Sequence, residues 1–331
     1  MSSKKPIIFW SMKKNSISEA AQIIKNGGLV AFPTETVYGL GANALNPFAV
    51  AKIFELKERP SFDPLIVHIA SFDNLKTLST CVNENVMRLA KHFWPGPLTI
   101  VLPKSPIVPD IVTSGLDTVG IRMPNNPIAL ALIKESKCPI AAPSANKFGQ
   151  LSPVNANHVK KQLPDVDYIL DGGNTTVGIE STIVSIEGDT CHLLRPGFIT
   201  PELIEKALPN TFVFIGTKPE KLISPGLLNS HYSPKKPLYI LNEPLRFFPE
   251  SSGLILHSNH HAIDTAAKVI YTSQTCNTIE ISANLFAALH AMEDDKGVKS
   301  IFIEPVEEIG LGIAIMDRVK KAAYRYNKPT N

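Results

Sequence analysis

The sequence predicts an α/β protein with one large open sheet and a second, smaller α/β unit. Short apolar runs typical of buried strands alternate with amphipathic helical patterns, and this alternation restarts after a proline-rich stretch. A length of 331 residues fits two domains. Hydrophobic residues make up 44% and charged residues 19%, as in soluble globular proteins, so neither disorder nor a coiled coil is expected.

The first helix and strand illustrate the pattern. Apolar residues recur at helical spacing from Ile17 to Ile24, and Gly27 and Gly28 end the helix. Asn46 and Pro47 are a typical cap and first residue of a second helix. Further strands are expected at 29–32, 65–70, 98–102, 119–123, 168–170, 181–186, 192–194 and in a run that ends at Ala142, and further helices at 85–93, 127–135 and after Thr200.

The domain boundary is predicted from proline spacing. Residues 1–216 form the first domain, and residues 217–237 carry several prolines without periodicity, which indicates an extended linker. Residues 238–331 form the second domain, with strands expected at 238–241, 253–257 and 299–303 and helices at 283–292 and 313–326. Gly310 and Gly312 lack the rest of a dinucleotide fingerprint, so a nicotinamide site is not expected.

Composition limits the cellular setting and the partners. The four cysteines are scattered, without the spacing of a zinc site, which favours free thiols in a reducing compartment. No apolar run approaches the roughly 18 residues of a membrane span, so we expect a cytoplasmic protein without a membrane partner. The net charge of +3 is too small to indicate nucleic-acid binding by itself.

Two polar motifs suggest an anion site. The segment 33–41, PTETVYGLG, joins a predicted strand to a predicted helix and combines hydroxyls with glycines that permit close backbone approach. Lys57 and Arg59 stand at a helix end, where two cations separated by one residue can converge on phosphate oxygens. Each motif also has an ordinary interpretation, as a turn with bonded hydroxyls or as a solvated helix end.

Further candidates lie within or after predicted strands. Arg122 stands among apolar neighbours, where an unpaired guanidinium would be costly, so it needs an anionic partner. Ser144 and Asn146 follow a buried strand, where open α/β sheets usually bind ligands. The segments GIESTIV, at 178–184, and LLRPG, at 193–197, add a hydroxyl pair and another arginine.

Together these motifs resemble a known family. The order PTETVYGLG, KERP, PLIVHI, WPGPLT, VGIRMP, APSAN, STIV and LLRPG, closed by SPG and HYSP, is similar to the YrdC-like threonylcarbamoyl-AMP synthases in their long, two-domain form. The match runs from about residue 15 to 235, and IGLGIAIM at 309–316 resembles the C-terminal domain signature. The resemblance implies a YrdC-like domain with an open twisted sheet and a concave basic cavity, a linker that covers the active site, and a Rossmann-like C-terminal domain.

The resemblance also implies an activity. Members of this family are nucleotidyltransferases that join L-threonine, bicarbonate and ATP into L-threonylcarbamoyl-AMP and release pyrophosphate. A separate transfer complex then modifies an adenosine next to the anticodon of certain tRNAs. ATP is expected as a substrate, accompanied by Mg²⁺, and the tRNA itself is expected to make at most a weak contact.

The implied site residues fall into groups. The catalytic KxR and SxN motifs correspond to Lys57, Arg59, Ser144 and Asn146. The threonine site corresponds to Thr36, His68, Arg122, Ala142 and Ser181. The nucleotide site corresponds to Arg59, Asp63, Thr118, Ser144, Ser152, Arg195 and Tyr232, and no metal-ligand set is expected. Because Tyr232 lies in the linker, the linker is expected to close over the cavity and exclude water.

Two departures from the family pattern affect these expectations. Asp63 occupies a place where relatives commonly carry asparagine, and a carboxylate beside phosphates requires a cation such as Mg²⁺. The segment 316–319, MDRV, also differs from the usual form, so the C-terminal domain is assigned no role beyond a cover or a docking surface.

Two other functions were weighed. Hydrogenase maturation proteins use related carbamoyl-adenylate chemistry, but they are much longer and carry cysteine-rich zinc modules that this sequence lacks. An RNA-binding or ribosome-assembly module could use the same basic cavity without catalysis. Arg122 in an apolar strand favours a small-molecule pocket, whereas RNA stacking favours exposed aromatics on a basic face, and aromatics are only 7% here.

Overall fold

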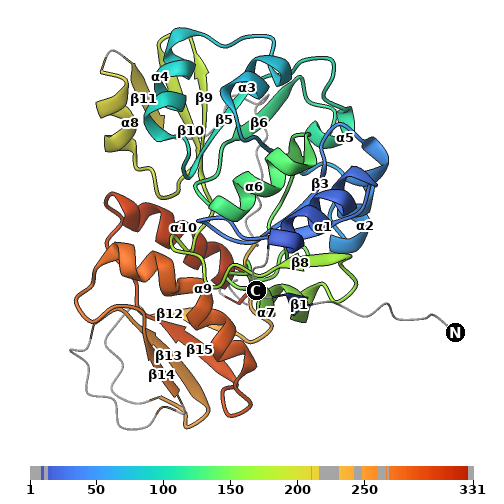
Figure 1. Cartoon of the computed structure of the whole chain (residues 1–331). Helices are drawn as coiled ribbons and strands as arrows, with labels where there is room; N and C mark the ends of the chain where they lie inside the picture. Colours follow the sequence, from blue (N-terminus) through green and yellow to red (C-terminus); the bar gives the residue numbers. More distant parts are fainter. Residues whose placement is uncertain are drawn as a thin grey trace, which may run out of the picture.

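The computed structural model describes residues 9–10, 14–209, 211–215, 231–241, 248–258, 266 and 268–326. Figure 1 shows two domains, each built around its own sheet, with helices α9 and α10 between the small sheet and the first domain. The predicted two-domain α/β class is confirmed. Most of the predicted linker, 217–230, lies outside the described residues.

The large sheet has 11 strands in the order β1-β8-β2-β3-β7-β4-β6-β5-β9-β10-β11. The strands are β1 (Phe9–Trp10), β2 (Val30–Phe32), β3 (Gly39–Asn43), β4 (Ile66–His68), β5 (Leu98–Pro103), β6 (Thr118–Arg122), β7 (Ile140–Ala141), β8 (Tyr168–Leu170), β9 (Thr182–Glu187), β10 (Thr190–Arg195) and β11 (Phe212–Ile215). Parallel and antiparallel pairs alternate irregularly across the sheet, which is therefore mixed.

The glycine-rich motif differs from its prediction as a simple loop between a strand and a helix. Residues 39–43 form β3, which pairs antiparallel with β2, so residues 33–38 are the connection of a hairpin. Glycine permits this pairing, because a Cβ at Gly41 would lie 2.7 Å from Phe32 Cε1 and 2.8 Å from Ile140 Cγ2. The hydroxyls of the motif therefore stand at the end of a sheet strand.

Helices surround the large sheet. They are α1 (Lys14–Lys25), α2 (Pro47–Lys57), α3 (Phe72–Leu78), α4 (Glu84–Phe93), α5 (Asp110–Thr113), α6 (Pro127–Ser136), α7 (Ala156–Gln162) and α8 (Pro201–Ala207). The predicted Asn-Pro start of α2 is confirmed, since the Asn46 side chain accepts the N–H groups of Phe48 and Ala49. At the other end of α2, Glu58 is left-handed at φ 55°, which turns the chain away before Arg59.

Within its described residues, the second domain has a four-stranded parallel sheet in the order β12-β15-β13-β14. Its elements are β12 (Leu238–Ile240), β13 (Ser252–Leu256), β14 (Lys268–Tyr271), α9 (Thr278–Asp294), β15 (Ser300–Ile303) and α10 (Leu311–Ala323). The predicted strands and helices are present, but the sequence analysis did not predict β14. The apolar run of Val269, Ile270 and Tyr271 was the available signal for it, although three of the strand's four residues are only half-buried and the fourth is exposed.

The two domains share a hydrophobic core. Val37, Leu151 and Ile179 of the first domain belong to the same buried cluster as Leu285 and Phe286 of α9. An interface packed like an interior holds the domains together through burial of apolar surface. No helix in the described part of the chain is long and apolar enough to cross a membrane.

Candidate active site

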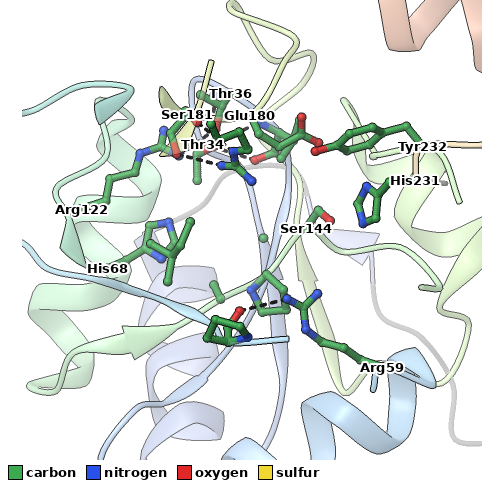
Figure 2. Close-up of a pocket in the computed structure, with 17 residues that line it drawn as sticks. Thr34, Thr36, Arg59, His68, Arg122, Ser144, Glu180, Ser181, His231 and Tyr232 are labelled. Carbon is green, nitrogen blue, oxygen red and sulfur yellow. Dashed lines mark hydrogen bonds between the residues drawn. The ribbon is translucent and has the colours of Figure 1, made fainter. Parts of the chain in front are cut away.

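A pocket with about 570 Å³ of open space lies where β4, β6, the β2–β3 connection and the turn after β7 meet the residues just before β12. Figure 2 shows Arg122 and Arg59 reaching it from opposite sides. The sequence-predicted residues that line it are Thr36, Arg59, His68, Arg122, Ala142, Ser144, Ser181, Arg195 and Tyr232. These residues are widely separated in the sequence, so the fold alone brings them together.

At one side of the pocket Arg122 is held rigidly. It is 3% exposed, and its Nη1 donates to Thr36 Oγ1 at 2.9 Å. Its Nη2 forms an ion pair with Glu35 Oε1 at 2.7 Å. The anionic partner that Arg122 required is therefore already present in the chain, and the sequence analysis did not single out Glu35. The acidic residue inside PTETVYGLG was the available signal.

His68 stands beside Arg122, because these residues are register partners on the parallel strands β4 and β6. Burial, reinforced by the charge of Arg122, lowers the pKa of His68 to about 3. The imidazole is therefore neutral at physiological pH and offers hydrogen bonds without adding charge.

At the other side of the pocket Arg59 is fixed by its own loop. Its Nε donates to Asp63 O and its Nη2 to Pro64 O, both at 3.0 Å, and Nη2 also pairs with Asp63 Oδ2 at 2.9 Å. Burial lowers the pKa of Arg59, but from an ordinary value so high that the guanidinium stays charged. The cation beside Asp63 is thus Arg59, and the carboxylate does not require a metal ion.

Arg195 and Ser181 form a second polar group in the lining. Arg195 Nε donates to Ser181 O and Nη2 to Ser181 Oγ, both at 3.1 Å. Ser181 Oγ also lies 2.8 Å from Thr99 Oγ1. The serine hydroxyl is thereby oriented by neighbours on both sides.

Three predicted site residues stand behind the lining. Lys57 and Asn146 are each 1% exposed, and Lys57 Nζ donates to Ser144 O at 2.6 Å and to Asn146 O. Ser152 Oγ donates to Glu180 Oε1 at 2.5 Å. These side chains contact the walls of the pocket from outside.

Thr118 lies in an adjoining cavity that shares Pro64 and Ile66 with the main pocket. Its other lining residues include Val101 and Ile183 as well as Thr99 and Thr113, so its surface mixes apolar side chains with hydroxyls. Ile66 pairs with Gly120 and His68 with Arg122, so β4 and β6 contribute to the lining of both cavities.

The sequence analysis missed an ion pair that crosses the domain interface. Glu180 lines the pocket, and its Oε2 lies 2.9 Å from Nε of Arg318, which is fully buried in α10. Arg318 and Arg195 hold the pKa of Glu180 below its usual value despite burial, which would otherwise raise it. A charged residue in the apolar pattern of α10 was the only signal for this pair.

His231 and Tyr232 complete the lining from the end of the predicted linker. Their ring centroids are 4.1 Å apart, and Arg318 lies 5.5 Å from the centre of the Tyr232 ring. Tyr232 has a left-handed backbone, at φ 58°, which costs a non-glycine residue energy and is often found at functional sites. Tyr232 thus links the pocket to the C-terminal domain.

No group of three or more His, Cys, Asp or Glu side chains within the described ranges is arranged to hold a metal ion. Mg²⁺ is usually bound through one or two carboxylates together with substrate phosphates, so this finding bears only on a site built from protein ligands alone. The lining carries Arg59, Arg122 and Arg195 as cations and Glu180 as an anion.

Comparisons with known proteins agree with this geometry. Residues 22–197 match the family model Sua5_yciO_yrdC, described as "Telomere recombination", and residues 199–324 match the "Threonylcarbamoyl-AMP synthase, C-terminal domain". Proteins named threonylcarbamoyl-AMP synthase are 44% identical in Pyrococcus abyssi, with 93% of this chain and 94% of that one covered, and 43% identical in Bacillus subtilis, with 93% and 92% covered.

A solved structure is similar over the same range. The crystal structure of P. abyssi Sua5 complexed with L-threonine aligns with a TM-score of 0.86 at 43% identity and covers 95% of this chain and 96% of that one. Both domain models and relatives that match over almost the full length support one assignment: this chain belongs to the threonylcarbamoyl-AMP synthase family, in its two-domain form.

Proposed function

We propose that this protein is an enzyme that makes L-threonylcarbamoyl-AMP from L-threonine, bicarbonate and ATP and releases pyrophosphate. The observation that carries the proposal is the pocket itself, which places Arg122 and Thr36 at one side and Arg59 and Ser144 at another. The lining thus offers cations and hydroxyls to an amino acid at one side and to a triphosphate at the other. The relatives' names and the L-threonine in the P. abyssi crystal structure support the same assignment.

The Arg122 side of the pocket suits threonine. A guanidinium binds a carboxylate in a planar, charge-assisted geometry, and Glu35 keeps Arg122 from swinging away. Neutral His68 and the Ser181 hydroxyl offer hydrogen bonds to the remaining polar groups of the amino acid. Ala142 leaves room for the side chain because it adds only a methyl group to the lining.

The reaction then needs two bond-forming steps. The threonine amine attacks carbon dioxide supplied by dehydration of bicarbonate, and loss of the amine proton gives a carbamate. A carbamate oxygen next attacks the α-phosphorus of ATP and displaces pyrophosphate. The carbamate is a weak and unstable nucleophile, so the enzyme contributes mainly orientation and electrostatic stabilisation.

The other two cations of the lining suit the leaving group. Arg59 and Arg195 neutralise phosphate charge, and both are fixed before substrate binds, so little reorganisation is needed. The Ser144 hydroxyl faces the same space and donates to a phosphate oxygen. Mg²⁺ would be held chiefly by the phosphates of ATP rather than by a protein ligand set.

The adjoining cavity suits the adenosine. The cavity as it stands has room for little more than a water molecule, so a base would enter it by displacing side chains, with Ile66, Val101 and Ile183 against its faces and the Thr118 hydroxyl at its edge. Because this cavity shares Pro64 and Ile66 with the main pocket, the phosphates of a nucleotide bound there would extend toward Arg59.

His231 and Tyr232 are placed to act as a cover that limits the entry of water into the pocket. A closed site protects an intermediate that hydrolyses readily.

We propose that the product passes to a tRNA threonylcarbamoyl-transfer complex in the cytoplasm, where the group is placed next to the anticodon. Removing residues 220–331 should then shorten product lifetime and lower product yield, and unchanged values would argue against the cover.

The test of the function is pyrophosphate release from ATP by the purified protein, with threonine and bicarbonate each included or omitted. Release should require both small substrates and should be strongly reduced in Ser144→Ala. If folded protein releases no pyrophosphate under any of these conditions, the synthase proposal fails, and tRNA binding should be measured as the alternative.

A further inference from the structure

The contacts of Lys57 do not match those of a phosphate ligand. Its side chain is 1% exposed, does not line the pocket, and extends beneath the turn that carries Ser144. Nζ donates to Ser144 O at 2.6 Å and also to Asn146 O. A lysine that bound phosphate would instead present its ammonium group to the open pocket.

The turn and the end of α2 are tied together in both directions. The backbone N–H of Phe148 donates to Lys57 O at 3.0 Å. In return, Lys147 Nζ donates to Leu56 O at 3.0 Å and pairs with Glu58 at 2.6 Å. Each segment thus sends a lysine to the other, and together they form a clasp of residues 56–58 and 144–148.

The opposite side of the turn is fixed by the glycine-rich hairpin. Ala145 N–H donates to Tyr38 O and Leu40 N–H donates to Pro143 O, both at 2.8 Å. Residues 143–145 therefore lie between β3 and the end of α2. Because both neighbours are bonded to it, a change in either one would move the Ser144 hydroxyl relative to the pocket.

Asn146 belongs to this support as well. Its Nδ2 donates to Lys147 O at 2.8 Å and to Gln150 O at 2.9 Å, so the amide closes the turn rather than facing the pocket. The KxR and SxN motifs therefore divide by position. Arg59 and Ser144 line the pocket, whereas Lys57 and Asn146 stand behind it.

We infer that Lys57 is a positioning residue, which acts through the Ser144–Asn146 turn and does not contact the phosphates of ATP. Its role rests on the proposed synthase function, because the turn matters for catalysis only if Ser144 contacts substrate. Burial, with a smaller contribution from the charge of Arg59, lowers the pKa of Lys57 well below its usual value, and an uncharged amine still donates both hydrogen bonds.

The experiment compares Lys57→Met, which keeps the length of the side chain but removes its donors, with Arg59→Met as the matched control. Pyrophosphate binding to the purified protein is measured by calorimetry. Measured in a Ser144→Ala background, which removes the hydroxyl that the turn positions, Lys57→Met should bind pyrophosphate within about threefold of that single variant, whereas Arg59→Met should lose about tenfold or more, since a charge-assisted hydrogen bond is lost. An equal loss in both variants would overturn the inference.

Hydrogen exchange reads the turn directly and does not depend on activity. The amides of Ala145 and Phe148 should exchange about tenfold faster or more in Lys57→Met, because buried carbonyls lose their donor. Exchange in Arg59→Met should match the parent. Unchanged exchange in Lys57→Met would show that the turn does not depend on Lys57, even if the protein proved to have another function.

A third variant, changed at an exposed position, keeps the test usable if Lys57→Met folds poorly. Lys147→Met breaks the clasp from its exposed side, and should speed exchange at Phe148 without weakening pyrophosphate binding.

In the turnover assay, Lys57→Met should lower kcat about tenfold in the parent and much less in a Ser144→Ala background. Independent, multiplying losses would instead indicate that Lys57 acts on substrate by itself.

Discussion

Arg122 shows how one residue can be placed by two others before substrate arrives. Glu35 and Thr36 hold two of its nitrogens, and Gly96 O accepts from Nε at 3.3 Å. A buried ion pair contributes little net stability, but it fixes geometry, and loss of one partner leaves the other charge unpaired. At the scale of single residues, the main effect of these contacts is therefore to orient charged side chains.

Arg122→Lys should weaken the use of threonine. Lysine can still pair with Glu35 but lacks the planar fork that binds a carboxylate, so the KM for threonine should rise about tenfold, equivalent to about 1.4 kcal/mol. The KM for ATP should change little. Steady-state pyrophosphate release measures both values, with Arg88→Lys on the surface of α4 as the control. Equal rises for both substrates would remove Arg122 from the threonine site.

Gly120 provides a test of the adenosine cavity. A methyl group added at this position would lie 3.3 Å from Thr99 Cγ2 and 3.7 Å from Ile66 Cγ1, in the wall of the cavity. Gly120→Ala should therefore raise the KM for ATP about fivefold, through about 1 kcal/mol of crowding. The KM for threonine serves as the internal control. If ATP use were unchanged, the base would have to bind elsewhere.

At the scale of elements, helix ends set the positions of the site residues. Asn46 fixes the start of α2 and the left-handed Glu58 fixes its end, so Lys57 extends beneath the Ser144 turn while Arg59 reaches the pocket. Asn126 starts α6 in the same way, with its side chain accepting the N–H groups of Ile128 and Ala129. The repeated Asn-Pro start is a local signal that tertiary packing did not override.

Asn126→Ala should lower the free energy of unfolding by about 1 kcal/mol, because two N–H groups lose their acceptor. Ser71→Ala is the matched control, since Ser71 precedes α3 without a side-chain cap bond, and it should change stability by less than about 0.5 kcal/mol. Chemical denaturation followed by circular dichroism measures both. A smaller effect at Asn126 than at Ser71 would contradict the assigned cap.

At the scale of the whole molecule, the C-terminal domain contributes a charge to the pocket wall. Arg318 pairs with Glu180 and also donates to Pro196 O at 2.8 Å. Arg318→Met should destabilise the folded protein by about 3 kcal/mol, because Glu180 stays buried without this ion pair while the charge of Arg195 offsets part of the loss. Thermal unfolding should then begin at a lower temperature, because the interface between the domains is weakened. Adding Glu180→Gln should recover part of the loss, and no recovery would mean that the pair is not coupled.

A pair of buried histidines at the domain interface leads us to expect that the stability of the folded protein depends on pH. His158 of α7 stacks on His290 of α9 with ring centroids 3.7 Å apart, and Lys161, Glu293 and Asp294 face the pair. Burial lowers the pKa of His158 to about 3 and that of His290 to about 4. The unfolded chain therefore binds protons below about pH 6.5 that the folded chain does not, so stability falls as pH falls through this window.

For His290, which is 1% exposed, the loss should be on the order of 3 kcal/mol by pH 4. His290→Gln keeps a donor for Ser152 O, which the ring contacts at 3.1 Å, and should flatten the pH profile. His192→Gln at a partly exposed position is the control. Denaturation at pH 7 and pH 4 measures the effect, and equal slopes in all three proteins would reject the assignment to His290.

The sequence alone determined much of this protein, because several of its signals are local. Alternating apolar runs predicted the two sheets, the Asn46-Pro47 pair predicted the start of α2, and the ordered motifs indicated the family and most of the pocket lining. Helix caps and glycine turns depend on a few neighbouring residues, so a sequence pattern can reveal them.

Only the tertiary structure decided which partner each charge has. Glu35 with Arg122 and Glu180 with Arg318 meet through strand register and domain packing, although the partners are 87 and 138 residues apart in the sequence. The same applies to Lys57, whose sequence position suits a phosphate ligand but whose burial beneath the Ser144 turn does not. Sequence spacing fixes a side chain's place on its own element, whereas its direction into or behind a pocket depends on what packs against that element.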